Sequence, residues 1–175
     1  MRRLMLARHA KSSWGDVTLS DHDRPLNSRG RRAAPLVGRE LAGLDCIPDV
    51  VYSSTSARTR ETWLLMEPEF GGHPRVEFLR GLYLASPRMV LATVAATPRK
   101  AGTVMVLGHN PSSHALAAYL SRTGDKGEID RLRTKFPTGA VAVIELSADD
   151  WTKAEEGGEL LHLILPRRLE RRERR

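Results

Sequence analysis

The chain has 175 residues and a mass of 19.5 kDa, a size that suits one domain with its own hydrophobic core. Its composition, 41% hydrophobic and 28% charged, excludes a wholly disordered chain. The net charge is +7, and the single cysteine, Cys46, excludes an intrachain disulfide framework and a cysteine metal cluster.

Short apolar runs alternate with longer amphipathic stretches along the chain. The predicted strands cover residues 4–7, 49–52, 76–79, 103–107, 139–146 and 160–165. The predicted helices cover residues 28–44 and 55–66, and two more begin near residues 86 and 111. This alternation predicts an α/β sandwich with a largely parallel sheet. Residues 122–138 are polar without a clear period, and we interpret them as a candidate lid.

The positive charge is concentrated at the carboxyl end of the chain. Residues 166–175 hold six Arg and two Glu, a net of +4, which leaves +3 for residues 1–165. We therefore predict one domain over 1–165, followed by a basic, flexible tail at 166–175, with binding of an anionic partner by the tail as the alternative. A nucleic-acid-binding protein carries its basic patch on the folded body, so no nucleic-acid partner is expected.

The amino-terminal residues are not expected to form a signal peptide. Too few apolar residues separate Arg3 from Arg8 for a signal-peptide core. No apolar run reaches the length needed to cross a bilayer. Together with the single cysteine, this predicts a cytoplasmic protein that does not contact membranes.

Three of the predicted strands end in charged or imidazole side chains. Arg8 and His9 follow the first strand, Arg58 lies one helical turn beyond the second, and His109 follows the fourth. Because ligands bind at the carboxyl ends of parallel strands, these side chains are expected to meet around one point. The sequence therefore predicts a site with two guanidinium and two imidazole groups.

Such a set suits a dianionic phosphoryl group. An arginine fork binds two phosphate oxygens at once, and a helix that begins after Gly108-His109-Asn110-Pro111 adds free backbone N–H groups. An imidazole can attack phosphorus and carry the phosphoryl group covalently. Arg24, in the polar loop after the first strand, is a further candidate for phosphate binding.

Four segments carry a resemblance to a known family. They are Leu6-Ala7-Arg8-His9-Ala10, Asp23-Arg24-Pro25-Leu26, Ser53-Ser54-Thr55-Ser56-Ala57-Arg58 and Gly108-His109-Asn110-Pro111. In this order the chain resembles the histidine phosphatase superfamily, also called phosphoglycerate mutase-like, and in particular its SixA-type phosphohistidine phosphatase branch. The resemblance extends from about Leu4 to Leu120. It implies a three-layer αβα sandwich with a mostly parallel six-stranded sheet, and it implies neither a metal nor another cofactor.

The resemblance also implies a role for each site residue. His9 is the expected nucleophile, forming a phosphohistidine intermediate. Arg8 and Arg58 are expected to bind phosphate oxygens, and His109 is expected to donate a hydrogen bond to the same group. Arg24 matches the additional arginine that this branch carries in its first loop. The catalytic set is thus His9, Arg8, Arg58 and His109, and the phosphate-binding set is Arg8, Arg24, Arg58 and His109.

Two positions depart from the wider superfamily. The third residue of the Arg-His-Gly signature is Ala10, which the SixA-like branch also tolerates. Mutases and many phosphatases carry a carboxylate after the third strand, where this chain has Arg80-Gly81. Glu77 lies nearby, although strand alternation can direct its side chain elsewhere. His109, Tyr83 or a carboxylate of the first loop remains as an alternative proton donor.

These residues predict a metal-independent phosphatase that acts through phosphorylated His9, most directly on a protein phosphohistidine. The first alternative is a small-molecule phosphoester phosphatase of the same superfamily. The second is a non-catalytic module that binds phosphate or nucleic acid. A phosphomutase is disfavoured, because mutases of the superfamily are longer. The expected partner is a phosphorylated protein or a small phosphorylated substrate, and the sequence does not determine the oligomeric state.

Two other residues of the first loop stay open at this point. Trp14 suits either a core anchor or a wall of the site. His22 is interpreted as a surface or structural residue, although its loop also carries Arg24.

Overall fold

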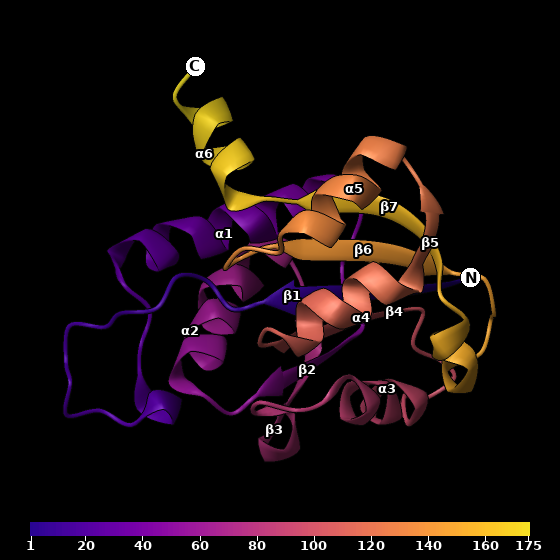
Figure 1. Cartoon of the computed structure of the whole chain (residues 1–175), viewed down its shortest axis with the longest axis horizontal. Coiled ribbons are helices and arrows are strands. Elements are labelled where there is room, and N and C mark those ends of the chain that lie inside the picture. The colour runs from indigo at the N-terminus through magenta and orange to yellow at the C-terminus, as the bar shows by residue number, and fades with distance from the viewer.

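The computed structural model describes residues 1–175 and contains one sheet with helices on both faces (Figure 1). The strands lie in the order β3-β2-β4-β1-β6-β7-β5. Their bounds are β1 Arg2–Arg8, β2 Val50–Ser54, β3 Arg75–Leu79, β4 Thr103–Gly108, β5 Ser121–Gly124, β6 Val141–Leu146 and β7 Gly158–Ile164. The fold is the predicted three-layer αβα sandwich.

The directions of the strands determine which strand ends lie at the same edge of the sheet. The pairs β1–β4, β2–β4, β2–β3 and β5–β7 are parallel, whereas β6 is antiparallel to both of its neighbours, β1 and β7. Six of the seven strands therefore run in the same direction. The carboxyl ends of β1, β2, β4 and β7 lie along one edge of the sheet.

The two faces of the sheet follow from alternation along each strand. On β1, Leu4 and Leu6 enter one apolar cluster with residues of α3, α4 and α5, whereas Met5 and Ala7 enter another with residues of α1, α2 and α6. Figure 1 shows these two groups of helices on opposite sides of the strands. The helices are α1 Ser28–Gly43, α2 Ala57–Met66, α3 Pro87–Ala95, α4 Ser112–Leu120, α5 Lys126–Thr134 and α6 Pro166–Glu173.

Side-chain caps define where several helices begin. The carboxamide oxygen of Asn27 accepts a hydrogen bond from the N–H of Gly30, so α1 begins at Ser28. The hydroxyl of Ser56 accepts one from the N–H of Thr59, and α2 therefore begins at Ala57. Each cap removes an otherwise unsatisfied donor of the first turn.

The expected number of six strands was one too few. The seventh is β5, which pairs with β7 inside the segment interpreted as a candidate lid, and α5 follows it. Ile129 and Leu132 of α5 are buried in the core, so this segment is part of the sandwich. The sequence of α5 has only two buried apolar residues among polar ones, which is too weak a periodicity to predict a helix. The strand β5 pairs with β7 through its main chain, so its side chains show no strand pattern.

The segment 166–175, predicted as a basic and flexible tail, is helical over most of its length, because residues 166–173 form α6. Its leucine, Leu169, is buried in the apolar cluster beneath α1 and α6, and Pro166 at its start is also buried. Ion pairs from Arg172 to Glu40 and from Arg168 to Glu128 hold the helix to α1 and α5. A single leucine among arginines gives no clear pattern, and the partner carboxylates lie more than 30 residues away in the sequence.

None of these helices combines the length and the apolar character that crossing a bilayer requires.

Candidate active site

The five site residues predicted from the sequence line one cavity of about 210 Å³ at the carboxyl edge of the sheet. Arg8 is the last residue of β1 and His9 follows it, whereas His109 follows β4, the neighbouring strand. Arg58 is the second residue of α2, which begins after β2. Arg24 reaches the same cavity from the first loop. The alternation of strands and helices thus brings together residues that lie up to 101 positions apart.

His9 is buried and held in one tautomer. Its Nδ1 lies 2.7 Å from the carbonyl oxygen of Ala10, and a carbonyl only accepts, so Nδ1 carries the proton. In the neutral ring Nε2 therefore keeps its lone pair. Burial lowers the pKa of His9 to about 3, and the neighbouring His109 and Arg58 act in the same direction. At neutral pH His9 is an uncharged imidazole, the form that acts as a nucleophile.

His109 stands beside it, with the two ring centroids 5.4 Å apart. Its Nε2 lies 2.8 Å from the hydroxyl oxygen of Ser54, and its Nδ1 lies 3.5 Å from a terminal nitrogen of Arg58. Arginine only donates, so Nδ1 faces Arg58 unprotonated and Nε2 donates to Ser54. Burial and then the charge of Arg58 lower the pKa of His109 to about 4. This ring is therefore also neutral at pH 7.

Asp21 connects two of the arginines and was not predicted from the sequence. Arg58 donates to both the backbone carbonyl and the carboxylate of Asp21, and Arg24 donates to the other carboxylate oxygen at 2.9 Å. The hydroxyl of Tyr83 donates to the same carboxylate. These hydrogen bonds, from Tyr83 first and then from the two arginines, hold the pKa of Asp21 far below its usual range. Asp21 is thus ionised at neutral pH and acts as an acceptor.

The guanidinium groups retain donors that the protein does not use. The Nε atoms of Arg8, Arg24 and Arg58 are buried without a hydrogen-bond partner. Arg8 donates through one terminal nitrogen to the carbonyl of Phe136, which fixes its direction. Buried donors without partners are costly, and an anion in the cavity can satisfy such groups.

Two helices fix the loop that carries His9. The backbone N–H of Ala10 donates to the hydroxyl of Thr62 on α2. On α1, Gly30 packs so closely against the first loop that a Cβ there would clash with the carbonyl oxygen of Lys11. His9 therefore lies on a short segment that contacts α1 on one side and α2 on the other.

Trp14 forms a wall of the cavity. Its side chain is exposed, and the guanidinium carbon of Arg24 lies 3.5 Å from the centre of its ring. The remaining lining residues were not predicted as site residues; they are Lys11, Ser12, Leu84, Asn110 and Thr138. Lys11 and Ser12 follow His9 so closely that proximity alone is a signal for them, whereas Leu84 and Thr138 are placed by the fold.

Comparison with known proteins agrees with this geometry. Residues 4–82 match the family described as the histidine phosphatase superfamily (branch 1). An uncharacterised protein of Mycobacterium tuberculosis is 36% identical over 153 residues, which cover 86% of this chain and 92% of the relative. The structure of a protein from Nakamurella multipartitia, assigned as a phosphohistidine phosphatase SixA, is 36% identical with a TM-score of 0.81 and covers 94% of this chain and 96% of its own.

This chain belongs to the histidine phosphatase superfamily, in its SixA-type branch. A structure from Agrobacterium tumefaciens with the same assignment is 29% identical, with a TM-score of 0.78, and covers 94% of this chain and 98% of its own. The chain is therefore a phosphatase.

As a SixA-type phosphatase it lacks the carboxylate that other branches place after the third strand. Glu77 on β3 forms an ion pair with Arg75 at 2.6 Å and does not line the cavity. The carboxylate at the site is Asp21, which comes from the first loop. No group of three or more His, Cys, Asp or Glu side chains is arranged as metal ligands.

Proposed function

We propose that this phosphatase hydrolyses a phosphohistidine of a protein substrate through a phosphorylated His9. The Nε2 atom of His9 attacks phosphorus and forms a P–N bond, while the P–N bond of the substrate breaks. The leaving imidazole keeps the electron pair and takes a proton from solvent. Water then attacks the phosphorus on His9, releases inorganic phosphate and returns the free imidazole.

Arg8, Arg24 and Arg58 bind the phosphoryl oxygens in this scheme. Their charge and fixed N–H groups stabilise the charge that develops on the transferring group. In the free site Asp21 accepts from Arg24 and Arg58, so a bound phosphoryl group exchanges these contacts for its own oxygens. His109 lies beside Arg58. In its other neutral tautomer Nδ1 carries the proton and donates to the phosphoryl group, while Nε2 accepts from the hydroxyl of Ser54.

The observation that supports this substrate class is that neither the two histidines nor the carboxylate of the site can act as a proton donor at neutral pH. His9 and His109 have pKa values of about 3 and 4, and Asp21 is ionised. An alkoxide leaving group needs a positioned proton donor, whereas imidazole is protonated by solvent on its other nitrogen. Such a site suits phosphohistidine better than an alkyl phosphate. The free, buried thiol of Cys46 supports a reducing compartment, and we place the reaction in the cytoplasm.

One contact favours an alternative substrate, a small phosphoester. Burial and the adjacent Asp21 raise the pKa of Tyr83, so its hydroxyl keeps its proton at neutral pH. The ring of Tyr83 packs edge-on against His109, with centroids 5.5 Å apart. If Tyr83 gives a proton to an alkoxide, sugar phosphates become good substrates.

A series of phosphate esters of graded leaving-group pKa tests the two alternatives. We expect log(kcat/KM) to fall steeply as the leaving-group pKa rises, and phosphohistidine peptides to be preferred over aryl phosphates and far over alkyl phosphates. Tyr83→Phe should leave this slope unchanged. A flat slope in the wild type that becomes steep in Tyr83→Phe would instead establish the small-molecule phosphatase with Tyr83 as its acid.

A further inference from the structure

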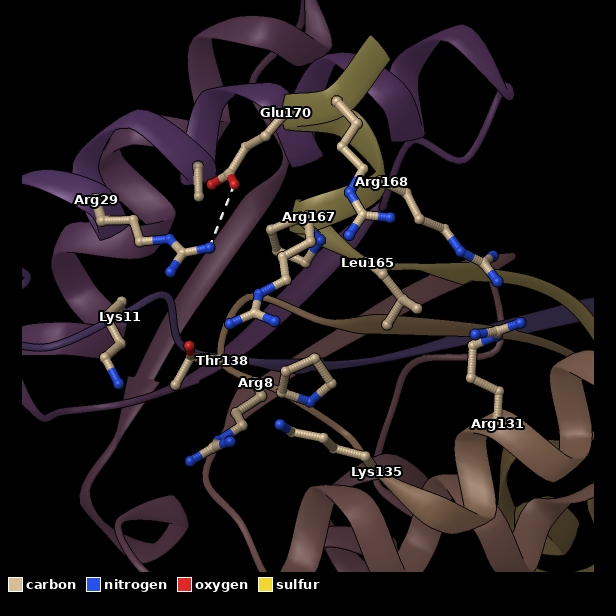
Figure 2. Close-up of a pocket in the computed structure, with 14 residues that line it drawn as sticks. Arg8, Lys11, Arg29, Arg131, Lys135, Thr138, Leu165, Arg167, Arg168 and Glu170 are labelled. Carbon is tan, nitrogen blue, oxygen red and sulfur yellow. Dashed lines mark hydrogen bonds and ion pairs between the residues drawn. The ribbon is translucent and has the colours of Figure 1, made fainter. Parts of the chain in front are cut away.

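A second, larger cavity of about 430 Å³ adjoins the catalytic one. The two share Arg8, Lys11 and Thr138 along their common border. The second cavity lies between α1, the segment after α5 and the first turns of α6 (Figure 2). We call it the basic cavity, because its lining includes eight Lys or Arg residues and a single acid, Glu170.

Most of these cations lack a counter-charge. Glu170 pairs with Arg29 at 3.3 Å, and Glu128 pairs with Arg168 and Arg131 from outside the lining. The other five cations form no ion pair within the chain; they are Arg8, Lys11, Lys135, Arg167 and Arg171.

The unpaired cations come from separate parts of the chain. Figure 2 shows the charged ends of Arg8, Lys11, Lys135 and Arg167 gathered around Thr138, on side chains from β1, the first loop, the α5–β6 connection and α6. Like charges held together repel one another, and an anion in the cavity relieves that repulsion. The fold thus assembles a strongly cationic hollow directly beside the phosphate-binding arginine.

The nature of the lining indicates which anion fits. Small-molecule sites are lined mostly by apolar and aromatic side chains with a few fixed polar groups. The basic cavity has the opposite character, because long and largely exposed Lys and Arg side chains dominate its wall. Flexible surface cations of this kind suit the carboxylates of a protein segment, which they attract through charge complementarity.

We propose that the basic cavity binds a carboxylate-rich segment of the protein that carries the phosphohistidine, while the phosphohistidine itself occupies the catalytic cavity. This inference rests on the proposed function and extends it to the recognition of the substrate. Arg8 borders both cavities, so the acidic segment lies next to the phosphorylated residue. Because the cations are exposed, the attraction acts mainly on association and weakens as salt is added.

The test compares two phosphohistidine peptides of the same length, one flanked by Asp and Glu and the other by Asn and Gln. We expect kcat/KM to be roughly tenfold higher for the acidic peptide at low ionic strength, and the ratio to fall towards one as salt rises. In the double variant Lys135→Glu with Arg167→Glu, this ratio should fall to one or below.

The matched control carries the same change in charge elsewhere. Arg99 and Lys100 are exposed in the connection before β4, at the opposite edge of the sheet from the site. Arg99→Glu with Lys100→Glu should keep the wild-type ratio between the two peptides. Circular dichroism and thermal melts establish that both double variants fold, and Lys135→Gln with Arg167→Gln replaces the first if it does not.

Three other outcomes would count against the acidic docking site. Equal kcat/KM for the two peptides in the wild type would overturn the acidic docking site and leave the phosphohistidine function standing. Hydrolysis of neither peptide, with good turnover of small esters, would overturn the proposed function and this inference with it. Inhibition by inorganic tripolyphosphate that disappears in Lys135→Glu with Arg167→Glu, together with equal peptide rates, would assign the cavity to a small polyanion instead.

Discussion

The catalytic cavity and the basic cavity both present arginines, yet they hold them in opposite ways. Arg24 and Arg58 are buried and fixed by the carboxylate of Asp21. Lys135 and Arg167 are exposed and have no ion-pair partner. Fixed donors can match the shape of a transition state, whereas mobile cations chiefly raise the local concentration of an anion. We therefore propose that arginines act in catalysis in the first cavity and in substrate recognition in the second.

The largest effect is expected at His9, the proposed nucleophile in the catalytic cavity. His9→Ala should lower turnover by about 10⁴-fold or more with every substrate, while the protein remains folded. Alkaline quenching of the wild type should retain a phosphoryl label on His9, and acid quenching should lose it. His73→Ala, at an exposed histidine, is the control and should keep full activity. A label on Ser or Cys, or an active His9→Ala protein, would contradict the mechanism.

The next effect separates fixed arginines from exposed ones. Arg58→Ala and Arg8→Ala should each lower kcat by roughly 10²- to 10³-fold, because each loses a donor to the transferring group. Arg24 is held by Ser12 and Asp21, so Arg24→Ala should cost a similar amount.

The matched control is Arg60→Ala, two residues from Arg58 on the exposed side of α2. It should behave as the wild type in steady-state kinetics with a chromogenic ester. Near wild-type kinetics in all three site variants would show that the phosphate binds elsewhere.

A smaller effect is expected in α6, which forms part of the basic cavity. Leu169 is buried beneath this helix, so Leu169→Ala should lower the free energy of unfolding by about 2 kcal/mol in urea denaturation. Leu64→Ala, at an exposed leucine of α2, should change it little. A Leu169→Ala protein as stable as the wild type would mean that α6 is not packed on the sheet in solution.

The smallest effect is the pH dependence of the free energy of unfolding, which we attribute to the two histidines of the catalytic cavity. His9 and His109 have pKa values of about 3 and 4 in the folded protein, against about 6.5 when unfolded. Below pH 6.5 the unfolded chain binds more protons, so stability falls with falling pH, by about 1 kcal/mol for each histidine between pH 6.5 and 5.5. Urea titrations should show a weaker pH dependence in His9→Asn with His109→Asn. An unchanged dependence would mean that these rings titrate normally.

The sequence predicted which residues meet in the first cavity, and the reason is physical. Arg8 ends β1 and His9 follows it, His109 follows β4, and Arg58 lies in the first turn of the helix after β2. The order of the strands therefore brings these four residues together. Asp21 was missed because its role depends on the path of an irregular loop. Asp21 and Tyr83 lie 62 residues apart in the sequence, and no local pattern predicts their contact.

The basic cavity could not be predicted from the sequence, for a different reason. Its cations come from α1, α6 and the segments around Lys11 and Lys135, and only the packed fold shows that they share one hollow. The helix α6 was also missed, since its position depends on Leu169 and on carboxylates of α1 and α5. Local patterns predicted strands and their ends, whereas contacts between the later elements required the structure.

The close packing of Gly30 has a consequence for protein engineering. Glycine within a helix is a standard target for stabilisation, because alanine favours the helix by up to about 1 kcal/mol. At Gly30 the new Cβ would meet backbone atoms of Lys11, which cannot rotate away, and would displace the segment that carries the nucleophile. Gly43, at the other end of the same helix, has no atom within 4 Å of an added Cβ. A stabilising alanine is therefore better placed at Gly43. The same substitution at Gly30 would gain helix propensity but would displace the segment that carries His9.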